Sequence, residues 1–296
     1  MKESFSGLSI TPIIVDMRDK NRLQQVIKKH QPQIVFHAAA HKHVTMMELN
    51  IEEAVTNNIL GTKNLVEVCL EAEVSKFVMI STDKAIRPKN VMGASKRIAE
   101  MIVLRAAQKS KRSFCVVRFG NVLGSRGSVV PLFKRQIVKG GPITITHPDM
   151  KRYFMTIPEA VYLVLQSAGM ARGGETFVLN MGDQVKIVDL AEDLIRLSGL
   201  EPGRDIEIVF TGSRPGEKLE EDLWDEGLTF QRTNHPDIYH LSNQDDLSTE
   251  DLDLLVDDLV NLAKTGNISE IVSIFDEKIP GAQVRKTPPA DLNTIS

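Results

Sequence analysis

The 296-residue sequence contains only two cysteines and one tryptophan, and it has no long apolar run. Cys69 and Cys115 lie far apart and belong to no pairing motif, which excludes a disulfide framework and argues against a metal site. We therefore expect free thiols in a reducing compartment. No apolar run approaches the roughly 18 residues needed to cross a bilayer, and Met1 to Ser4 lack a signal-peptide core. These absences predict a cytoplasmic protein without a membrane segment.

A large excess of charge of one sign is also missing. The net charge is -3 at pH 7, so the chain has no global attraction for nucleic acid or for an anionic membrane. Any phosphate group must therefore be bound by local arginine and lysine side chains. Nucleic acid is not an expected partner.

A glycine-rich turn is missing near the N-terminus. Gly7 is the only glycine before Gly61, whereas a dinucleotide-binding fold begins with a strand, a glycine-rich turn and a helix. The first strand-like run, Ile10 to Val15, ends in Asp16 instead. We expect the sequence to enter such a fold at its third strand. Two interpretations stay open: the gene product starts upstream, or the chain is a remnant that has lost its cofactor loop.

Strand-like and helix-like segments alternate along the sequence, which predicts an α/β fold with a parallel sheet. The N-cap, first-turn proline and third-position glutamate of Thr156 to Glu159 predict the start of a helix. From Asp245 the chain becomes acidic and helical, and the tail after Lys278 is expected to be loosely ordered. The expected strands are Ile13 to Val15, Gln33 to His37, Lys76 to Ser81 and Ser113 to Arg118; the expected helices include Ile51 to Ala72, Gly93 to Lys109, Val161 to Met170 and Val185 to Ser198.

Polar residues follow the apolar strand Phe77 to Ile80. Thr82, Asp83 and Lys84 stand at its carboxyl end, the edge at which ligands bind to open α/β sheets. An acid and a base side by side at this edge are candidates for proton transfer. That role requires a partly neutral lysine and a partly protonated aspartate, so we expect both pKa values to be displaced toward neutrality.

Met92 and Lys96 are spaced i,i+4 at the start of the next helix, so their side chains share one face. In the short-chain dehydrogenase superfamily these two places hold a tyrosine and a lysine. The three tyrosines, Tyr153, Tyr162 and Tyr239, are not followed by a lysine four residues later. A thioether cannot accept a proton. The proton of a substrate alcohol must then leave through Asp83, Lys84 or a water held by Thr82.

Five segments occur in an order that resembles a known family. They are His37–Val44 (HAAAHKHV), Asn57–Asn64 (NNILGTKN), Ser81–Lys96 (STDKAIRPKNVMGASK), Arg118–Pro131 (RFGNVLGSRGSVVP) and Gly212–Leu219 (GSRPGEKL). Together they resemble bacterial nucleoside-diphosphate-sugar 4,6-dehydratases of surface-polysaccharide biosynthesis, the CapD-like extended short-chain dehydrogenases that act on UDP-N-acetylglucosamine. The resemblance runs from about Ile13 to Asn243.

The resemblance implies NAD as cofactor and a Rossmann-like, doubly wound parallel sheet, N-terminally truncated, with a smaller α/β substrate-binding part. Considered alone, Asp16 could equally cap a helix, and the alanines after the second strand could equally serve strand–helix packing. The residues implied to bind the cofactor are Asp16, Met17, Ala38, Ala39, Ala40, Asn57, Ser81 and Lys96.

A UDP-sugar is the implied substrate, and its diphosphate favours arginine donors. By resemblance, Asn121, Arg152 and Arg214 surround the diphosphate, and Glu217 accepts bonds from the uridine ribose. Lys42 is a weaker candidate for the sugar or its phosphates. Taken singly, such surface residues more often have no ligand, and the Arg-Pro-Gly-Glu order is what favours a binding loop.

The implied reaction is an internal redox cycle in which hydride passes from C4 of the sugar to NAD+ and later returns to C6. Lys84 removes the C5 proton, and Asp83 protonates the departing C6 hydroxyl. Thr82, Met92 and Lys96 complete the implied catalytic set. Relatives that keep the tyrosine include those that invert C5, so Met92 favours retention.

The expected domains are a cofactor-binding part over residues 1–120 with a return segment near 155–182, and a substrate-binding part over 121–154 and 183–296. We expect a homo-oligomer, and the resemblance allows longer relatives anchored at a membrane. Two other readings stay open. One is a sugar 4-epimerase or reductase of the same superfamily, which would normally carry the tyrosine. The other is a non-catalytic remnant or partner subunit. Because the glycine-rich turn is missing, we also expect the 296-residue chain to bind NAD+ far more weakly than a complete relative and to aggregate or swap strands.

Overall fold

The computed structural model describes residues 7–125, 127–224, 229–241 and 249–286. At its centre is a six-stranded sheet in the order β1-β2-β3-β8-β12-β11. The first four strands of this order run parallel, and the last two are antiparallel additions. The strands are β1 (Ile34–His37), β2 (Lys76–Ile80), β3 (Ser113–Arg118), β4 (Asn121–Val122), β5 (Ile143–Ile145), β6 (Lys151–Arg152), β7 (Phe154–Met155), β8 (Thr176–Leu179), β9 (Val185–Lys186), β10 (Ile208–Phe210), β11 (Phe230–Arg232) and β12 (Ile238–Leu241).

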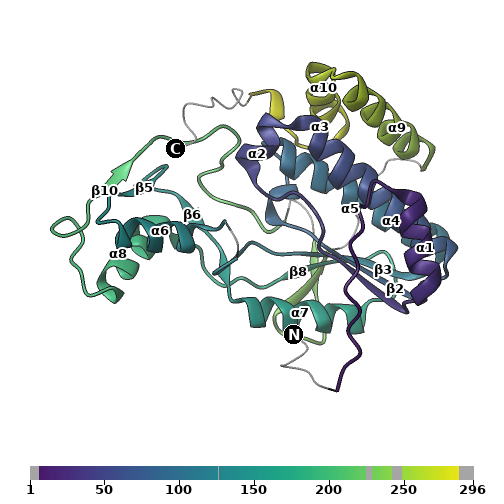
Figure 1. The fold of residues 1–296 in the computed structure, drawn as a ribbon, viewed down its shortest axis with the longest axis horizontal. Coiled ribbons are helices and arrows are strands. Elements are labelled where there is room, and N and C mark those ends of the chain that lie inside the picture. Colours follow the sequence, from purple (N-terminus) through teal and green to yellow (C-terminus); the bar gives the residue numbers. More distant parts are fainter. Residues whose placement is uncertain (1–6, 126, 225–228, 242–248, 287–296) are drawn as a thin grey trace.

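Helices cover both faces of this sheet, so it is doubly wound and Rossmann-like, as predicted (Figure 1). The α-helices are α1 (Lys20–His30), α2 (Val44–Leu49), α3 (Ile51–Glu53), α4 (Gly61–Glu71), α5 (Val91–Ser110), α6 (Val129–Val138), α7 (Ile157–Met170), α8 (Ile187–Leu197), α9 (Thr249–Thr265) and α10 (Ile268–Lys278). The π-helix η1 (Ala54–Leu60) joins α3 to α4, and η2 (Asp83–Ala85) and η3 (Val284–Lys286) are short 3-10 helices.

Side chains that alternate along β2 pack into two different hydrophobic cores. Phe77 and Met79 pack into the core shared with α4 and α5, whereas Val78 packs into the core beneath α7. Successive residues of a strand point to opposite faces of the sheet, so a strand that is apolar at every position is buried on both faces. This burial fixes the register of β2 and therefore the place where the polar residues after it emerge.

Two predicted helix starts are confirmed. The Thr156 side chain accepts from Glu159 N and the Glu159 side chain accepts from Thr156 N, which completes the capping box of α7. In α5 the Asn90 side chain accepts from Gly93 N at 2.7 Å. Such caps satisfy amide groups that the first helical turn leaves without intrahelical partners.

The predicted strand at Ile13 to Val15 is wrong. This segment has no strand conformation, and Ile14 is 98% exposed. A strand needs a neighbour for its backbone hydrogen bonds. In the described sheet β1 is an edge strand that pairs only with β2, and the segment before α1 pairs with no strand. Asp16 therefore does not follow a strand.

A smaller α/β part has its own core, built from α6, α8, β5 and β10. Figure 1 shows these elements grouped to one side of the large sheet. The sequence-based division also assigned the C-terminal helices to this part. In the structure, α9 and α10 instead pack on α3, η1 and α5 and bury Leu259 and Phe275 in the first core. The apolar side chains of these acidic helices, at helical spacing, decide their position.

The expectation of a loosely ordered tail after Lys278 is corrected in part. Ile279 and Val284 are buried, and Val284 N donates to Asp276 Oδ1 at 2.6 Å. Residues 287–296, to which the expectation also applied, lie outside the described part of the chain.

One face of α7 is apolar and exposed. Ile157, Val161 and Leu165 recur at i,i+4 spacing and are each about half exposed, beside Phe36 of the edge strand β1. Contiguous apolar surface of this kind marks a contact face. Within the described ranges, no helix is both long and apolar enough to traverse a bilayer, and the same residues hold no group of three or more metal-ligating side chains.

Candidate functional site

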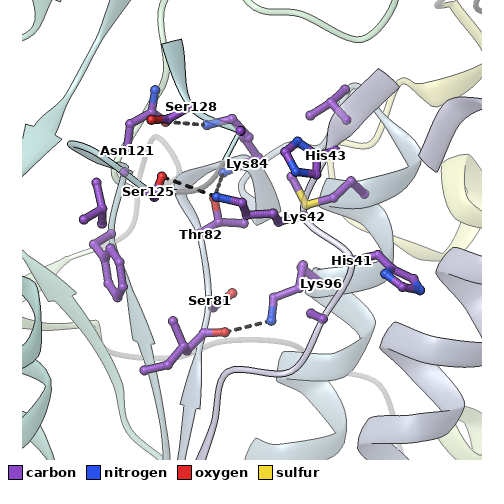
Figure 2. A pocket seen from close by; sticks show the side chains of 18 of the residues that line it. His41, Lys42, His43, Ser81, Thr82, Lys84, Lys96, Asn121, Ser125 and Ser128 are labelled. Carbon is purple, nitrogen blue, oxygen red and sulfur yellow. Dashed lines mark hydrogen bonds between the residues drawn. The ribbon is translucent and has the colours of Figure 1, made fainter. Parts of the chain in front are cut away.

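A cavity of about 370 Å³ opens at the carboxyl ends of β1, β2 and β3 (Figure 2). This is the edge predicted from the sequence. The cavity brings together residues from four expected segments that are far apart in the chain. Of the predicted site residues it is lined by Ala38, Ala40, Lys42, Ser81, Thr82, Lys84, Met92, Lys96 and Asn121.

Buried Asp83 and partly buried Lys84 form an ion pair at the end of β2, with Lys84 Nζ 3.0 Å from Asp83 Oδ1. Lys84 Nζ also donates to Asn121 Oδ1 at 3.2 Å and lies 3.6 Å from Glu221 Oε1. Thr82 Oγ1 donates to Asp83 Oδ1 at 2.8 Å, while Asp83 Oδ2 is buried without a hydrogen-bond partner. The predicted acid and base are therefore adjacent, and the free carboxylate oxygen can accept one more donor.

The expectation that Lys84 is shifted toward neutrality is wrong for this state of the protein. Burial lowers the pKa of Lys84, but the carboxylates of Asp83 and Glu221 raise it by more, so the net pKa lies above its ordinary value. Two carboxylates favour the charged amine. Lys84 therefore rests as a cation and must lose a proton before it can act as a base.

Met92 and Lys96 lie on the same face of α5 and both line the cavity, as their spacing predicted. Lys96 Nζ donates to Ile80 O at 2.7 Å, and burial lowers the pKa of Lys96 to about 8. Met92 is 3% exposed. Glycine at position 93 lets α5 lie close to the chain after β2, because a Cβ at this position would clash with Lys84 O.

Three predicted substrate residues lie around an adjoining cavity of about 250 Å³, which Asn121 and Ser128 also line. Arg152 Nη1 donates to Lys151 O and to Leu219 O, and Glu217 Oε2 accepts from Arg214 N. Asn121 lines both cavities, so the two cavities adjoin. Arg152, Arg214 and Glu217 come together here as the resemblance implied.

Lys42 approaches from the other wall, and Figure 2 shows its amine directed at Ser125. Lys42 Nζ donates to Ser125 Oγ at 3.3 Å. Burial lowers the pKa of Lys42. This contact joins the segment after β1 to the loop before α6 across the mouth of the cavity.

Four predicted cofactor residues do not line the cavity: Asp16, Met17, Ala39 and Asn57. The Arg18 guanidinium binds Asp16 at 2.7 Å, and its hydrogen bonds lower the pKa of that carboxyl to about 2. Met17 is buried against Gly61. In this structure Asp16 and Met17 therefore lie apart from the cavity.

The link between η1 and the segment after β1 is made by Asn58 and not by Asn57. Asn58 Oδ1 accepts from His41 N, while its Nδ2 donates to His41 O and to Ser95 Oγ. Asn57 only donates to Asn58 Oδ1. Asn58 is 1% exposed. Because Asn57 and Asn58 are adjacent and identical in type, the sequence alone could not show which of the two side chains is buried.

Two further residues near the site were missed. Glu221 stands in the charged run Glu217 to Asp222, a pattern that usually marks a solvated surface, yet it is 3% exposed. Glu100 lies inside α5, where it accepts from Ser81 Oγ at 2.5 Å and pairs with Arg118. The Ser81 hydroxyl is thus tied to a buried carboxylate.

The cavity residues fit the nicotinamide end of a dinucleotide. Ala38 and Ala40 leave the backbone after β1 uncovered, and Lys96 uses one of its three amine donors on Ile80 O. The described residues provide no glycine-rich turn leading into a helix beside this cavity, so no pyrophosphate site of that kind is present among them.

Comparison with known proteins identifies relatives over most of the chain. Residues 2–243 match the family described as polysaccharide biosynthesis protein. The chain is 57% identical over 86% of its length to the capsular polysaccharide biosynthesis protein CapD of Staphylococcus aureus, and it spans 42% of that relative. It is 36% identical to an inverting UDP-N-acetylglucosamine 4,6-dehydratase of Campylobacter jejuni, over 84% of this chain and 74% of the relative. A UDP-glucose 4-epimerase of Rickettsia canadensis is 37% identical over 75% of this chain and 64% of its own length.

Solved structures show the same fold. The structure of Pen from Bacillus thuringiensis superposes with a TM-score of 0.74 at 34% identity, over 90% of this chain and 85% of that one. The dTDP-glucose 4,6-dehydratase DesIV of Streptomyces venezuelae, solved with NAD bound, superposes with a TM-score of 0.63 at 19% identity, over 71% of this chain and 69% of that one.

Proposed function

Because the chain belongs to the family of polysaccharide biosynthesis proteins, we propose that it catalyses NAD-dependent 4,6-dehydration of UDP-N-acetylglucosamine with retention at C5. The observation that carries this proposal is the Asp83–Lys84 pair, with Lys84 and Met92 lining one cavity. Dehydration needs both an acid and a base, whereas hydride transfer alone needs one base. A cytoplasmic location and a homo-oligomeric state belong to the same proposal.

The nucleotide is proposed to lie in the adjoining cavity. Arg152 and Arg214 would face the diphosphate, Glu217 the ribose hydroxyls, and Asn121 the boundary between the two cavities. This arrangement would direct the sugar toward Lys84, because Asn121 already contacts its amine. NAD, when bound beside Lys96, supplies the acceptor for the C4 hydride and the donor of the hydride to C6.

The first proton to move is that of the C4 hydroxyl. Thr82 lines the cavity and donates to Asp83 Oδ1 at 2.8 Å, so its hydroxyl can pass this proton to Asp83. Met92 cannot take part, since a thioether is not a base. Asp83 then holds the proton that the departing C6 hydroxyl requires.

Lys84 is proposed to take the proton from C5 once it is neutral. The C5–H bond breaks toward Nζ, the C6–O bond breaks, and Asp83 gives its proton to the leaving oxygen, which departs as water. After hydride reaches C6, Lys84 returns its proton to C5. Because one amine removes and returns the proton, it acts on one face of the sugar, which supports retention.

A 4-epimerase is the competing function, since an epimerase is among the relatives. None of Tyr153, Tyr162 and Tyr239 lines the cavity, which argues against a tyrosine base. Incubation with NAD+ and UDP-N-acetylglucosamine in deuterated water tests the proposal. The expected product has lost water and carries deuterium at C5 in the original configuration. Inversion at C5 would contradict retention, and a product of unchanged mass with inverted C4 would identify an epimerase.

A further inference from the structure

Glu221 faces the Lys84 amine from the loop that also carries Arg214 and Glu217. Its Oε1 lies 3.6 Å from Lys84 Nζ, and its side chain is 3% exposed. The second oxygen, Oε2, is buried without a hydrogen-bond partner. Burying a carboxyl group with an unsatisfied oxygen is costly, so Glu221 has the setting of a functional group.

The position of Glu221 is fixed by its neighbours. Lys218 Nζ donates to Ile86 O at 2.8 Å and lies 3.9 Å from Glu221 Oε2. Arg87 pairs with Asp222 at 2.9 Å. These contacts attach the loop on both sides of Glu221 to the segment that follows Lys84. The carboxyl group is therefore held beside the amine by the structure of the loop.

We propose that Glu221 is a positioning residue that takes the proton from Lys84 before each dehydration and returns it afterwards. The inference rests on the proposed function, which needs a neutral Lys84. In the transfer an N–H bond of the ammonium breaks and an O–H bond of the carboxyl forms. The 3.6 Å separation is longer than a hydrogen bond, and such contacts shorten when the substrate is bound.

The surroundings raise the pKa of both groups, which favours a proton on Glu221 and opposes its loss from Lys84. Asp83, Glu221 and Arg152 face Lys84, and the two carboxylates keep its pKa above the ordinary value against the effect of burial. Burial raises the pKa of Glu221, Lys84 lowers it and Asp83 raises it, and with the smaller effects of Arg152 and Lys218 the net pKa lies above its ordinary value. A carboxyl group with a raised pKa is a better proton acceptor. Loss of the Lys84 proton to a neighbouring carboxylate also leaves two neutral groups, which a buried site favours over a separated pair.

The proton balance closes over one turnover. Lys84 gives a proton to Glu221, takes one from C5, delivers one of its exchangeable ammonium protons to C5 after hydride transfer and recovers one from Glu221. Asp83 gains the C4 hydroxyl proton and loses it to the leaving water. No external acid or base is consumed.

Glu221→Gln tests this role because glutamine has the same shape and accepts no proton. Two pH dependences are measured: that of kcat, and that of the rate at which an amine-reactive reagent labels Lys84, followed by peptide mass spectrometry. We expect the labelling midpoint to fall by about one pH unit, because a carboxylate near the amine is lost. We expect the acid limb of kcat to move the other way, to higher pH, because Lys84 must now lose its proton to water.

The opposite directions separate this role from a merely structural one. If Glu221 only stabilised the ammonium, both midpoints would fall together in Glu221→Gln, and the proposal would be wrong. Unchanged midpoints would also overturn it. Glu221→Asp keeps a carboxyl group and should keep the acid limb of the unaltered protein at a reduced kcat. The matched control is Glu220→Gln, whose carboxylate is 57% exposed and pairs with Lys151; neither midpoint should move.

The two proposals can fail separately. If the unaltered protein does not dehydrate UDP-N-acetylglucosamine, the proposed function fails. If Lys84 is also labelled with the same pH midpoint in the unaltered protein and in Glu221→Gln, the proposed interaction between Glu221 and Lys84 fails as well. If the unaltered protein dehydrates the substrate and Glu221→Gln shows the same acid limb, only the role of Glu221 is overturned.

Discussion

Glu100 and Arg118 form a two-bond ion pair in the interior, with Nε–Oε1 at 2.8 Å and Nη2–Oε2 at 2.6 Å. Neither side chain is more than 1% exposed. Glu100 also accepts from Ser81, the first residue after β2. This pair therefore connects α5, the end of β3 and the edge of the sheet from which Thr82, Asp83 and Lys84 emerge.

Glu100→Gln should lower the free energy of unfolding by about 3–5 kcal/mol, because it leaves a buried guanidinium without its carboxylate. Denaturant unfolding measures this change. Glu192→Gln is the matched control, since Glu192 pairs with Arg196 at 2.7 Å on the protein surface, and this pair should contribute less than about 1 kcal/mol. Equal losses in the free energy of unfolding for the two substitutions would contradict this prediction, because they would show that the buried pair stabilises the fold no more than the surface pair.

Lys84→Ala should reduce dehydration by about 100-fold or more, the usual contribution of a positioned acid or base. Binding of the UDP-sugar should stay within a few-fold, because the residues around the adjoining cavity are unchanged. Calorimetry and product analysis measure the two effects. Lys134→Ala, on the exposed face of α6, serves as control, and near-normal turnover by Lys84→Ala would remove Lys84 from the mechanism.

Met92→Leu should keep most of the activity. The side chain is 3% exposed and contributes shape and packing, and a volume-conserving exchange costs less than about 1.5 kcal/mol. Steady-state rates of Met92→Leu and Asp83→Asn would be compared side by side. A loss in Met92→Leu as large as that in Asp83→Asn would mean that the site depends on the thioether itself.

Val161→Glu and Leu165→Glu should weaken association of the protein with itself. Both side chains are 53% exposed on the apolar face of α7, and a charge there disfavours burial against another surface. Sedimentation velocity over a range of concentrations measures the effect. Leu197→Glu, at a more exposed position on α8, should leave association unchanged, and an equal effect of all three substitutions would argue against the α7 face.

The sequence predicted the parallel strands β1 to β3 and the start of α7, because local patterns specify them: apolar runs for the strands and the Thr156–Glu159 capping box for the helix. It could not predict that Ile13 to Val15 form no strand. A strand depends on a partner elsewhere in the sheet, and the described sheet ends at β1.

Only part of the site could be predicted from the sequence. Asp83, Lys84 and Met92 could be placed because they lie close in sequence at a strand end and a helix start. The burial of Glu221 could not be predicted, because it depends on long-range contacts of the neighbouring residues. Lys218 contacts Ile86 and Asp222 contacts Arg87, and each of these pairs is separated by more than 130 residues in the sequence. The pKa of Lys84 was mispredicted because the Asp83 carboxylate, and then the Glu221 carboxylate that the sequence did not place here, raise it by more than burial lowers it.

The proposed dehydration is tested most directly by following the hydrogen at C4. The protein is incubated with NAD+ and UDP-N-acetylglucosamine that carries deuterium at C4, and the product is examined by mass spectrometry and NMR. Dehydration through an internal hydride transfer gives a 4-keto-6-deoxy sugar that has lost one water and carries the deuterium at C6, with no net reduction of NAD+. Deuterium that stays at C4 in an epimerised sugar of unchanged mass, or that accumulates in NADH, would contradict it.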